Sequence, residues 1–477
     1  METVVFYDLS VWRSIFLVAI LLSSLLLAHI LKCRGPLKNS LMPNAVLGGI
    51  IILMISTILY YTTGDYLFDQ SWLSDSQSGM NTLEILTYHC LAVGFISMTL
   101  RESENKSKGR TKDVVNSGIL TVSTYLIQGF IGILITLIAS FVISGVVPGS
   151  GMLLCFGFGQ GTGQALTQGA NFDSAAGSGA IYSNLGLAIA AAGFLIASLG
   201  GVVVLNILRR SKKLPLKDSK IQADTDRKAQ EALYIEEMST NESVDKLSIQ
   251  FGLIFLAYAL AWFMMFILGK LVSSMIGTIY GFNFLFGVIS AVIVKAVLKA
   301  FKKKGLIKRQ YNNTFLLNRI SGFAFDLMIV SGICAIKTHL LLDYIWIFIV
   351  MIAVGTAATF AYVWYVSKKV FTGCRYEQFF AFFGMLTGTA STGVILLREI
   401  DPTLESEAAE NIVYQNIPAI IFGIPLLAIA SMLYSSYEGA FSITRVLIVL
   451  AIVLVYFIVL NIILFRKNIF RKKKKNE

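Results

Sequence analysis

The chain has 477 residues, of which 56% are hydrophobic and only 14% are charged, and its formal net charge is +12. Soluble domains have about 25% charged residues, so this chain has too few charges to cover a water-facing surface. The composition excludes a soluble globular protein and indicates a membrane protein. Cytoplasmic loops of membrane proteins collect Lys and Arg, which explains the positive charge more simply than nucleic-acid binding does.

Eleven apolar segments are long enough to cross about 30 Å of hydrocarbon as helices. The first is too long for the core of a signal peptide and lacks a small-residue cleavage site. Two further apolar stretches, 149–172 and 379–397, are rich in Gly, Ser and Thr. We predict membrane spans at 12–32, 44–63, 83–100, 114–144, 178–208, 249–272, 277–300, 315–336, 340–366, 411–434 and 441–465.

The basic residues predict the orientation of the spans. If the N-terminus lies outside and the spans alternate, 36 of the 40 Lys and Arg residues fall on the inner side. This is the bias expected of a membrane protein whose C-terminus is cytoplasmic. The bias survives only if each Gly-rich stretch enters and leaves the membrane on the same side. We therefore predict that both stretches are re-entrant hairpins.

The spans predict two inverted repeats in an all-α membrane protein. Five spans precede a polar segment, five follow it, and each set has its Gly-rich stretch between the fourth and fifth span. An odd number of crossings turns the second repeat upside down, an arrangement common in alternating-access carriers. The predicted parts are a first repeat at 1–208, a cytoplasmic linker at 209–247, a second repeat at 248–434, and at 435–477 an appended anchor helix with a basic tail.

The Gly-rich stretches carry the predicted binding residues. Glycine allows the backbone to turn and other groups to approach closely. Free N–H groups at the start of a half-helix attract anions, whereas free carbonyls and hydroxyls suit a cation such as Na⁺. The predicted solute-binding residues are Gly159, Gln160, Gly161, Thr162, Gly163, Gln164, Gly388, Thr389, Ser391, Thr392 and Gly393.

Other readings of these stretches are possible. Gly, Ser and Thr also pack membrane helices together without any ligand. A phosphate-binding P-loop is excluded at 157–163 because no Gly-Lys-Ser/Thr follows, and a dinucleotide fold is excluded because no βαβ pattern surrounds the motif. The occurrence of two such stretches at matching repeat positions favours a binding site.

Several polar residues outside the Gly-rich runs are candidates for the same site. A lone carboxylate within a span is costly, so Asp326 is either a cation ligand or a hydrogen-bonded structural residue. Asn184 begins the helix that follows the first hairpin, and Gln415 opens the tenth span. Arg398 ends the second hairpin and either binds a solute carboxylate or pairs with a neighbouring acid. The predicted cation ligands are Asp326, Thr162, Thr387, Asn184 and Gln415.

Gln128 and Asn116 lie in the long span 114–144. We interpret both as polar residues that pack helices together.

At these motifs the chain resembles the bacterial sodium/glutamate symporter family. The run Phe158-Gly159-Gln160-Gly161-Thr162-Gly163 resembles the first pore loop of that family, which carries a Gly-Gly-x-Gly type motif. The segment 383–392 resembles the second pore loop, 42–49 the opening of the second helix, and 94–101 the end of the third. The resemblance covers about 12–434, nearly the whole chain.

The resemblance implies a homodimer with a rigid scaffold and a moving domain that holds the hairpins and works as an elevator. It also implies Na⁺-coupled transport of glutamate. The chain departs from the family at Phe158 and Leu386, where glycines are expected, and in the additional helix 441–465. These departures bear on the substrate more than on the fold.

The predicted function is therefore Na⁺-coupled uptake of glutamate or a similar small anionic solute across the cell inner membrane. The alternatives are a carrier of another dicarboxylate or amino acid, with H⁺ in place of Na⁺, or an ion channel, since re-entrant loops also build filters. An enzyme is disfavoured because three His and five Cys form no catalytic or metal-binding pattern. We expect no cofactor besides the coupling ion, and no nucleic-acid partner.

The re-entrant topology predicts a labelling pattern. Single cysteines at 160–164 should react with membrane-impermeant thiol reagents added outside, and those at 388–393 with reagents added to inverted vesicles. A stretch that reacts along its full length from both sides would cross the membrane and would contradict the topology.

Overall fold

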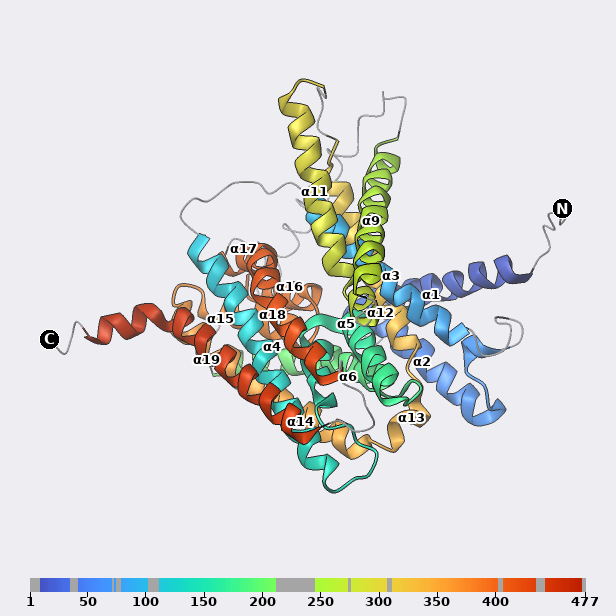
Figure 1. The fold of residues 1–477 in the computed structure, drawn as a ribbon, viewed down its shortest axis with the longest axis horizontal. Coiled ribbons are helices and arrows are strands. Elements are labelled where there is room, and N and C mark those ends of the chain that lie inside the picture. The colour runs from blue at the N-terminus through green and yellow to red at the C-terminus, as the bar shows by residue number, and fades with distance from the viewer. Residues whose placement is uncertain are drawn as a thin grey trace. The chain divides into compact units, whose positions relative to one another are not determined.

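The computed structural model describes residues 9–34, 42–70, 73, 79–101, 111–211, 245–272, 276–306, 311–401, 406–434 and 442–473. Throughout these ranges the regular structure is helical (Figure 1). Eleven described helices are long and apolar enough to cross a membrane, and each coincides with a predicted span, which indicates a multi-pass membrane protein. These spans are Trp12–Arg34, Asn44–Thr63, Gly79–Leu100, Lys112–Ser140, Ile181–Arg210, Lys246–Leu271, Asn283–Lys303, Thr314–Cys334, Ile345–Val370, Asn416–Tyr434 and Ile443–Arg466.

The helices form two compact units. Each unit takes helices from both predicted repeats, and both Gly-rich stretches belong to the second unit. The predicted linker lies outside the described residues from 212 to 244. The first unit comprises α1 (Leu9–Arg34), α2 (Asn44–Thr63), α3 (Gly79–Leu100), α9 (Lys246–Leu271), α10 (Ile276–Gly281), α11 (Asn283–Lys303) and α12 (Thr314–Cys334).

The second unit contains the remaining helices except the 3-10 turn η1 (Leu67–Asp69), which belongs to the first unit. Its first half holds α4 (Thr111–Ser140), η2 (Ser150–Met152), α5 (Leu153–Ala176), α6 (Ile181–Leu195), the π-helical turn η3 (Ile196–Gly200) and α7 (Gly201–Arg210). Its second half holds α13 (Thr338–Leu342), α14 (Ile345–Val370), α15 (Arg375–Thr387), α16 (Ala390–Arg398), α17 (Glu407–Tyr414), α18 (Asn416–Tyr434) and α19 (Ile443–Lys473).

In the first unit, α3 packs against α9, α11 and α12. A Cβ atom on Gly94 of α3 would lie 2.5 Å from the ring of Phe325, so a larger residue cannot occupy this crossing. The hydroxyl groups of Thr87 and Ser331 are 2.8 Å apart and join the same two helices. Small residues and buried hydroxyls are the usual means of packing helices inside a membrane.

In the second unit, α4 is the central helix and contacts α5, α14, α18 and α19. Glycines permit these approaches: a Cβ on Gly118 would lie 2.8 Å from Pro418, and one on Gly132 would lie 1.9 Å from the carbonyl oxygen of Gly151. Such contacts let neighbouring backbones come close. The unit is therefore assembled around one helix whose small residues face its partners.

The last helix, α19, is part of the second unit rather than a separate anchor. It packs against α4; Figure 1 draws α19 in red and α4 in cyan. The Tyr456 hydroxyl donates a 2.6 Å hydrogen bond to the Phe422 carbonyl, in the stretch of α18 that Pro425 interrupts. The Tyr362 hydroxyl of α14 donates to Asn461 at 2.9 Å. These bonds tie α19 to two other helices of the unit.

Asp173, near the end of α5, caps the start of α6. Ala180 at the N-cap position offers no side-chain bond. Instead the Asp173 carboxylate accepts 2.8 Å hydrogen bonds from the backbone N–H groups of both Tyr182 and Ser183, and it also accepts from the hydroxyls of Ser178 and Ser183. The N–H groups of a first helical turn have no partner within the helix, so this cap fixes α5 to α6.

We expect Asp173→Ala to lower the free energy of unfolding by about 2 to 3 kcal/mol, because it removes a charged cap from a buried helix start. The exposed Asp343, at the end of α13 in the same unit, supplies the control: Asp343→Ala should change stability by less than about 0.5 kcal/mol. Thermal unfolding of the detergent-purified proteins measures both. Equal melting temperatures for the two variants would contradict the proposed role of the cap.

Candidate functional site

The first Gly-rich stretch forms a helix, α5, that is broken at Gly161. This residue has φ 80° and ψ −173°, a backbone conformation that is readily open only to glycine. The break leaves one short helical segment before Gly161 and a longer one from Thr162 to Ala176. The glycine in the middle of the motif is therefore a requirement of the backbone.

Both ends of this stretch lie beside the start of α6. The Tyr182 hydroxyl accepts a 2.9 Å hydrogen bond from the N–H of Val147 and lies 3.3 Å from the carbonyl of Gly145. The N–H of the same tyrosine donates to Asp173, at the other end of the stretch. Between these ends, Phe158 lies against Gly193, about three turns further along α6. The chain thus runs along α6 to the break and returns.

The second Gly-rich stretch doubles back at Gly388, between α15 and α16. A Cβ on Gly393 would lie 2.2 Å from the carbonyl oxygen of Ala381, and one on Gly384 would lie 2.9 Å from the Cα of Gly393. Side chains at these positions would separate the two helices. Thr389 caps α16, since its hydroxyl accepts a 3.3 Å hydrogen bond from the N–H of Thr392.

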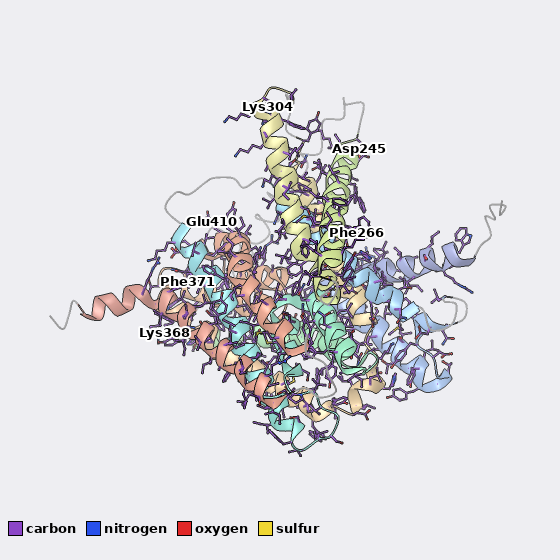
Figure 2. All side chains as sticks on the ribbon, in the orientation of Figure 1. Asp245, Phe266, Lys304, Lys368, Phe371 and Glu410 are labelled. Carbon is purple, nitrogen blue, oxygen red and sulfur yellow. The ribbon has the colours of Figure 1, made fainter. Side chains whose placement is uncertain are left out.

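This second hairpin begins and ends at the opposite end of the unit from the first. The chain leaves α14 at Phe371 (Figure 2) and starts α15, where Gln378 donates a 3.0 Å hydrogen bond to Ser117 near the start of α4. After α16, Glu399 forms an ion pair of 3.4 Å with Arg209 at the end of α7. The first hairpin instead begins and ends near the start of α6.

The start of α15 carries a buried thiol among carboxylates. Burial, and then the proximity of Glu407, Glu377 and Asp113, raise the pKa of Cys374 to about 12. The thiol remains protonated at neutral pH and reacts slowly. Thiol labelling near this end of the hairpin therefore reports on introduced cysteines rather than on Cys374.

The two breaks meet at Gln128 and Gly193. The Gln128 amide nitrogen donates a 2.9 Å hydrogen bond to the Leu386 carbonyl, in the last turn of α15. Its amide oxygen faces the first hairpin, where a Cβ on Gly159 would lie 3.3 Å from it. A Cβ on Gly193 would lie 2.2 Å from the Thr387 carbonyl oxygen and 3.0 Å from the Phe158 ring. One residue of α4 and one of α6 thus contact both hairpins.

Buried polar groups near this junction have unused hydrogen-bonding capacity. Among the described residues, the Gln164 amide has no partner at either its nitrogen or its oxygen, although the side chain is only 1% exposed. The amide oxygen of Gln128 and the hydroxyl of Ser198 also have no protein partner. A buried polar atom without a partner costs about 1 to 3 kcal/mol, so a polar ligand or water at this position would stabilise the unit.

Most of the predicted binding residues lie within two turns of a break. Gln160 is half-buried, whereas Thr162, Thr387 and Thr392 are fully buried. Ser391 belongs to α16, but its side chain lies outside the described part of the structure. The residues close to a break are Gly159, Gln160, Gly161, Thr162, Gly163, Gln164, Thr387, Gly388, Thr389, Ser391, Thr392 and Gly393.

Gln415 lies close to the second hairpin. The predicted tenth span starts as two helices, α17 and α18, because Pro418 has no N–H to bond the Tyr414 carbonyl and continue the helix. At the junction of these helices, the Gln415 side chain accepts a 2.8 Å hydrogen bond from Thr121 and lies 3.4 Å from the sulfur of Met385. It therefore connects α4 to the last turns of α15.

Three predicted site residues lie away from the junction. The Asn184 amide binds the backbone of Lys337 through both its oxygen and its nitrogen, at 2.5 and 2.9 Å, near the start of α6. Arg398 is exposed at the far end of α16 from Gly388. Asp326 is exposed on α12 and belongs to the first unit, whereas the hairpins belong to the second. Within the described residues, no group of three His, Cys, Asp or Glu side chains could hold a metal ion.

Gln128 and Gly193 were not among the predicted site residues. Gln128 was interpreted as a polar residue that packs helices, and it does so through its amide nitrogen. Its position in the middle of a long apolar helix was the available signal, since a buried amide there needs a partner. Gly193 ends the run Ala188-Ile189-Ala190-Ala191-Ala192-Gly193, in which nothing distinguishes it from other small packing residues.

Comparisons of the chain with protein-family models, curated proteins and solved structures find no match. The function proposed below therefore rests on the geometry of the second unit and on the sequence motifs.

We expect Gly193→Ala to destabilise the second unit by about 1 to 3 kcal/mol, because the added methyl group overlaps the Thr387 carbonyl and overpacks the junction. Gly200→Ala is the matched control, since its Cβ would meet only Ile196, at an ordinary 3.7 Å. Thermal unfolding in detergent measures both. A Gly193→Ala protein as stable as the control would show that α6 does not pack tightly on the second hairpin.

Proposed function

We propose that the chain is a secondary active transporter that couples the uptake of glutamate, or a related small anionic solute, to Na⁺. The observation that carries this proposal is the meeting of two broken helices, from opposite ends of one compact unit, at Gln128 and Gly193. Discontinuous helices that meet near the middle of the membrane form the binding sites of many carriers.

The chemistry of the junction suits an anion together with a cation. The N-terminus of α16 begins next to the break at Gly388, and the positive end of a helix dipole favours negative charge. On the other side of the same break, α15 ends in the carbonyls of Leu386 and Thr387, which suit a cation. Both charge types can therefore be held by backbone groups.

The division of the chain supports an elevator mechanism. The second unit contains both broken helices and would move as a body, and the first unit would act as the scaffold. Each unit takes its helices from both halves of the chain, as expected if each half repeats one topology. The proposed re-entrance of the hairpins agrees with the finding that each begins and ends at one end of the unit.

A second candidate is a carrier of another dicarboxylate or of an amino acid, with H⁺ as the coupling ion. Phe158 and Leu386, where the resembled family has glycines, are both fully buried at the junction. Their side chains take space beside the breaks, so they bear directly on which solute fits.

Purified protein in liposomes with an inward Na⁺ gradient should accumulate labelled glutamate above its external concentration. Collapse of the gradient with a Na⁺ ionophore should abolish accumulation, because the gradient supplies the free energy. Equal uptake with and without Na⁺ would contradict the coupling. Uptake that an inward H⁺ gradient drives in the absence of Na⁺ would favour the second candidate.

A further inference from the structure

We propose that the amide oxygen of Gln128 binds a cationic group at the junction of the two hairpins, either the coupling Na⁺ or the ammonium group of the solute. This inference rests on the proposed function and identifies one residue that recognises what is carried. It gives Gln128 a role in binding in addition to its role in packing.

Hydrogen bonding fixes the orientation of the Gln128 amide. The nitrogen donates to the Leu386 carbonyl and to the Thr359 hydroxyl, both at 2.9 Å. A carbonyl can only accept, and the Thr359 hydroxyl uses its own proton to bond the Gly355 carbonyl at 2.7 Å. Both partners therefore require the nitrogen, and the oxygen must point elsewhere.

The amide oxygen points to the first hairpin and lacks a donor. It faces Gly159, where a Cβ would lie 3.3 Å from the oxygen, and the other close neighbour at this glycine is the Tyr125 ring, which offers the oxygen no donor there. The Gln128 side chain is fully buried, and no described residue donates a hydrogen bond to this oxygen. Because a buried acceptor without a donor is costly, the arrangement is suited to a ligand that brings a positive charge or N–H donors.

The buried charges of the second unit do not oppose a cation at this oxygen. Asp173 is the one charged residue of the second unit that is buried within the described ranges. It lies at the end of the first hairpin that is far from the break, beside the start of α6. No buried Lys or Arg among the described residues competes for the oxygen. Bonds between an ionised group and a neutral partner are roughly twice as strong as bonds between two neutral groups.

Ligand binding to the purified protein tests this inference, with thermal stabilisation as the measurement. The three probes are Na⁺, glutamate and glutarate, which is glutamate without its ammonium group. Choline replaces Na⁺ in the control measurement. In Gln128→Leu the oxygen is lost. We expect the affinity for the cationic probe to be at least about tenfold weaker, because one charged hydrogen bond is lost. If Na⁺ is the ligand, the Na⁺ affinity falls. If the ammonium is the ligand, glutamate binding weakens while glutarate binding is unchanged.

Thr359→Val is the matched control for packing. It removes one acceptor of the amide nitrogen but leaves the oxygen in place, so it should lower the melting temperature and change the three affinities by less than about twofold. Gln128→Glu gives a second readout in case Gln128→Leu does not fold. Its carboxylate should bind the cation more tightly as pH rises and the proton leaves, so the affinity of the cationic probe becomes pH-dependent.

Equal affinities of wild-type and Gln128→Leu protein for all three probes would overturn the inference and leave the proposed function intact. A loss of affinity in Thr359→Val as large as in Gln128→Leu would also overturn it, because packing alone would then explain the effect. A wild-type protein that responds to none of the probes and transports none of them would instead refute the proposed function.

Discussion

The second unit depends on one constraint, which is that backbone groups released by a broken helix must find partners inside the protein. Lipid offers no hydrogen bonds, so irregular backbone at membrane depth is tolerated only where protein or a water-filled cavity surrounds it. The breaks at Gly161 and Gly388 meet this condition by lying between α4 and α6. The Tyr125 hydroxyl donates a 3.0 Å hydrogen bond to the Gly159 carbonyl, and Gln128 donates to the Leu386 carbonyl.

The same constraint explains the distribution of glycine in this unit. Gly157, Gly159 and Gly193 each lie so near a neighbouring helix of the unit that an added Cβ would come within 3 Å of it. Gly161 differs from them because its backbone has positive φ. One motif therefore combines glycines required for packing with a glycine required for the turn. This is why the Gly-rich runs stand out in a chain that is otherwise a series of uniformly apolar helices.

Apolar run length was sufficient to predict all eleven spans, because hydrophobic length is a local property of the sequence. The Gly-rich stretches at 149–172 and 379–397 indicated where the chain would be irregular, but they did not single out Gly161 as the residue that breaks α5. The partners of polar side chains were not predictable, because hydrogen bonds such as those between Asn184 and Lys337 join residues 153 positions apart. Asp326 was predicted to share a site with the hairpin residues because a charge inside a membrane is costly. That cost does not specify which unit holds the residue, and Asp326 belongs to the first unit.

The packing of α19 has a consequence for how the lipid bilayer acts on the protein. The helix is bonded to α14 and α18 and continues as far as Lys473, and its last eight residues include Arg466, Lys467, Arg471, Lys472 and Lys473. If the second unit is displaced during a transport cycle, this cationic end must travel with it relative to the headgroups. Each Lys or Arg near an anionic leaflet contributes about 1 kcal/mol of electrostatic attraction to the membrane surface. The anionic phospholipid content of the membrane would then enter the conformational equilibrium, so the occupancy of the two end states would vary with the membrane in which the protein is placed.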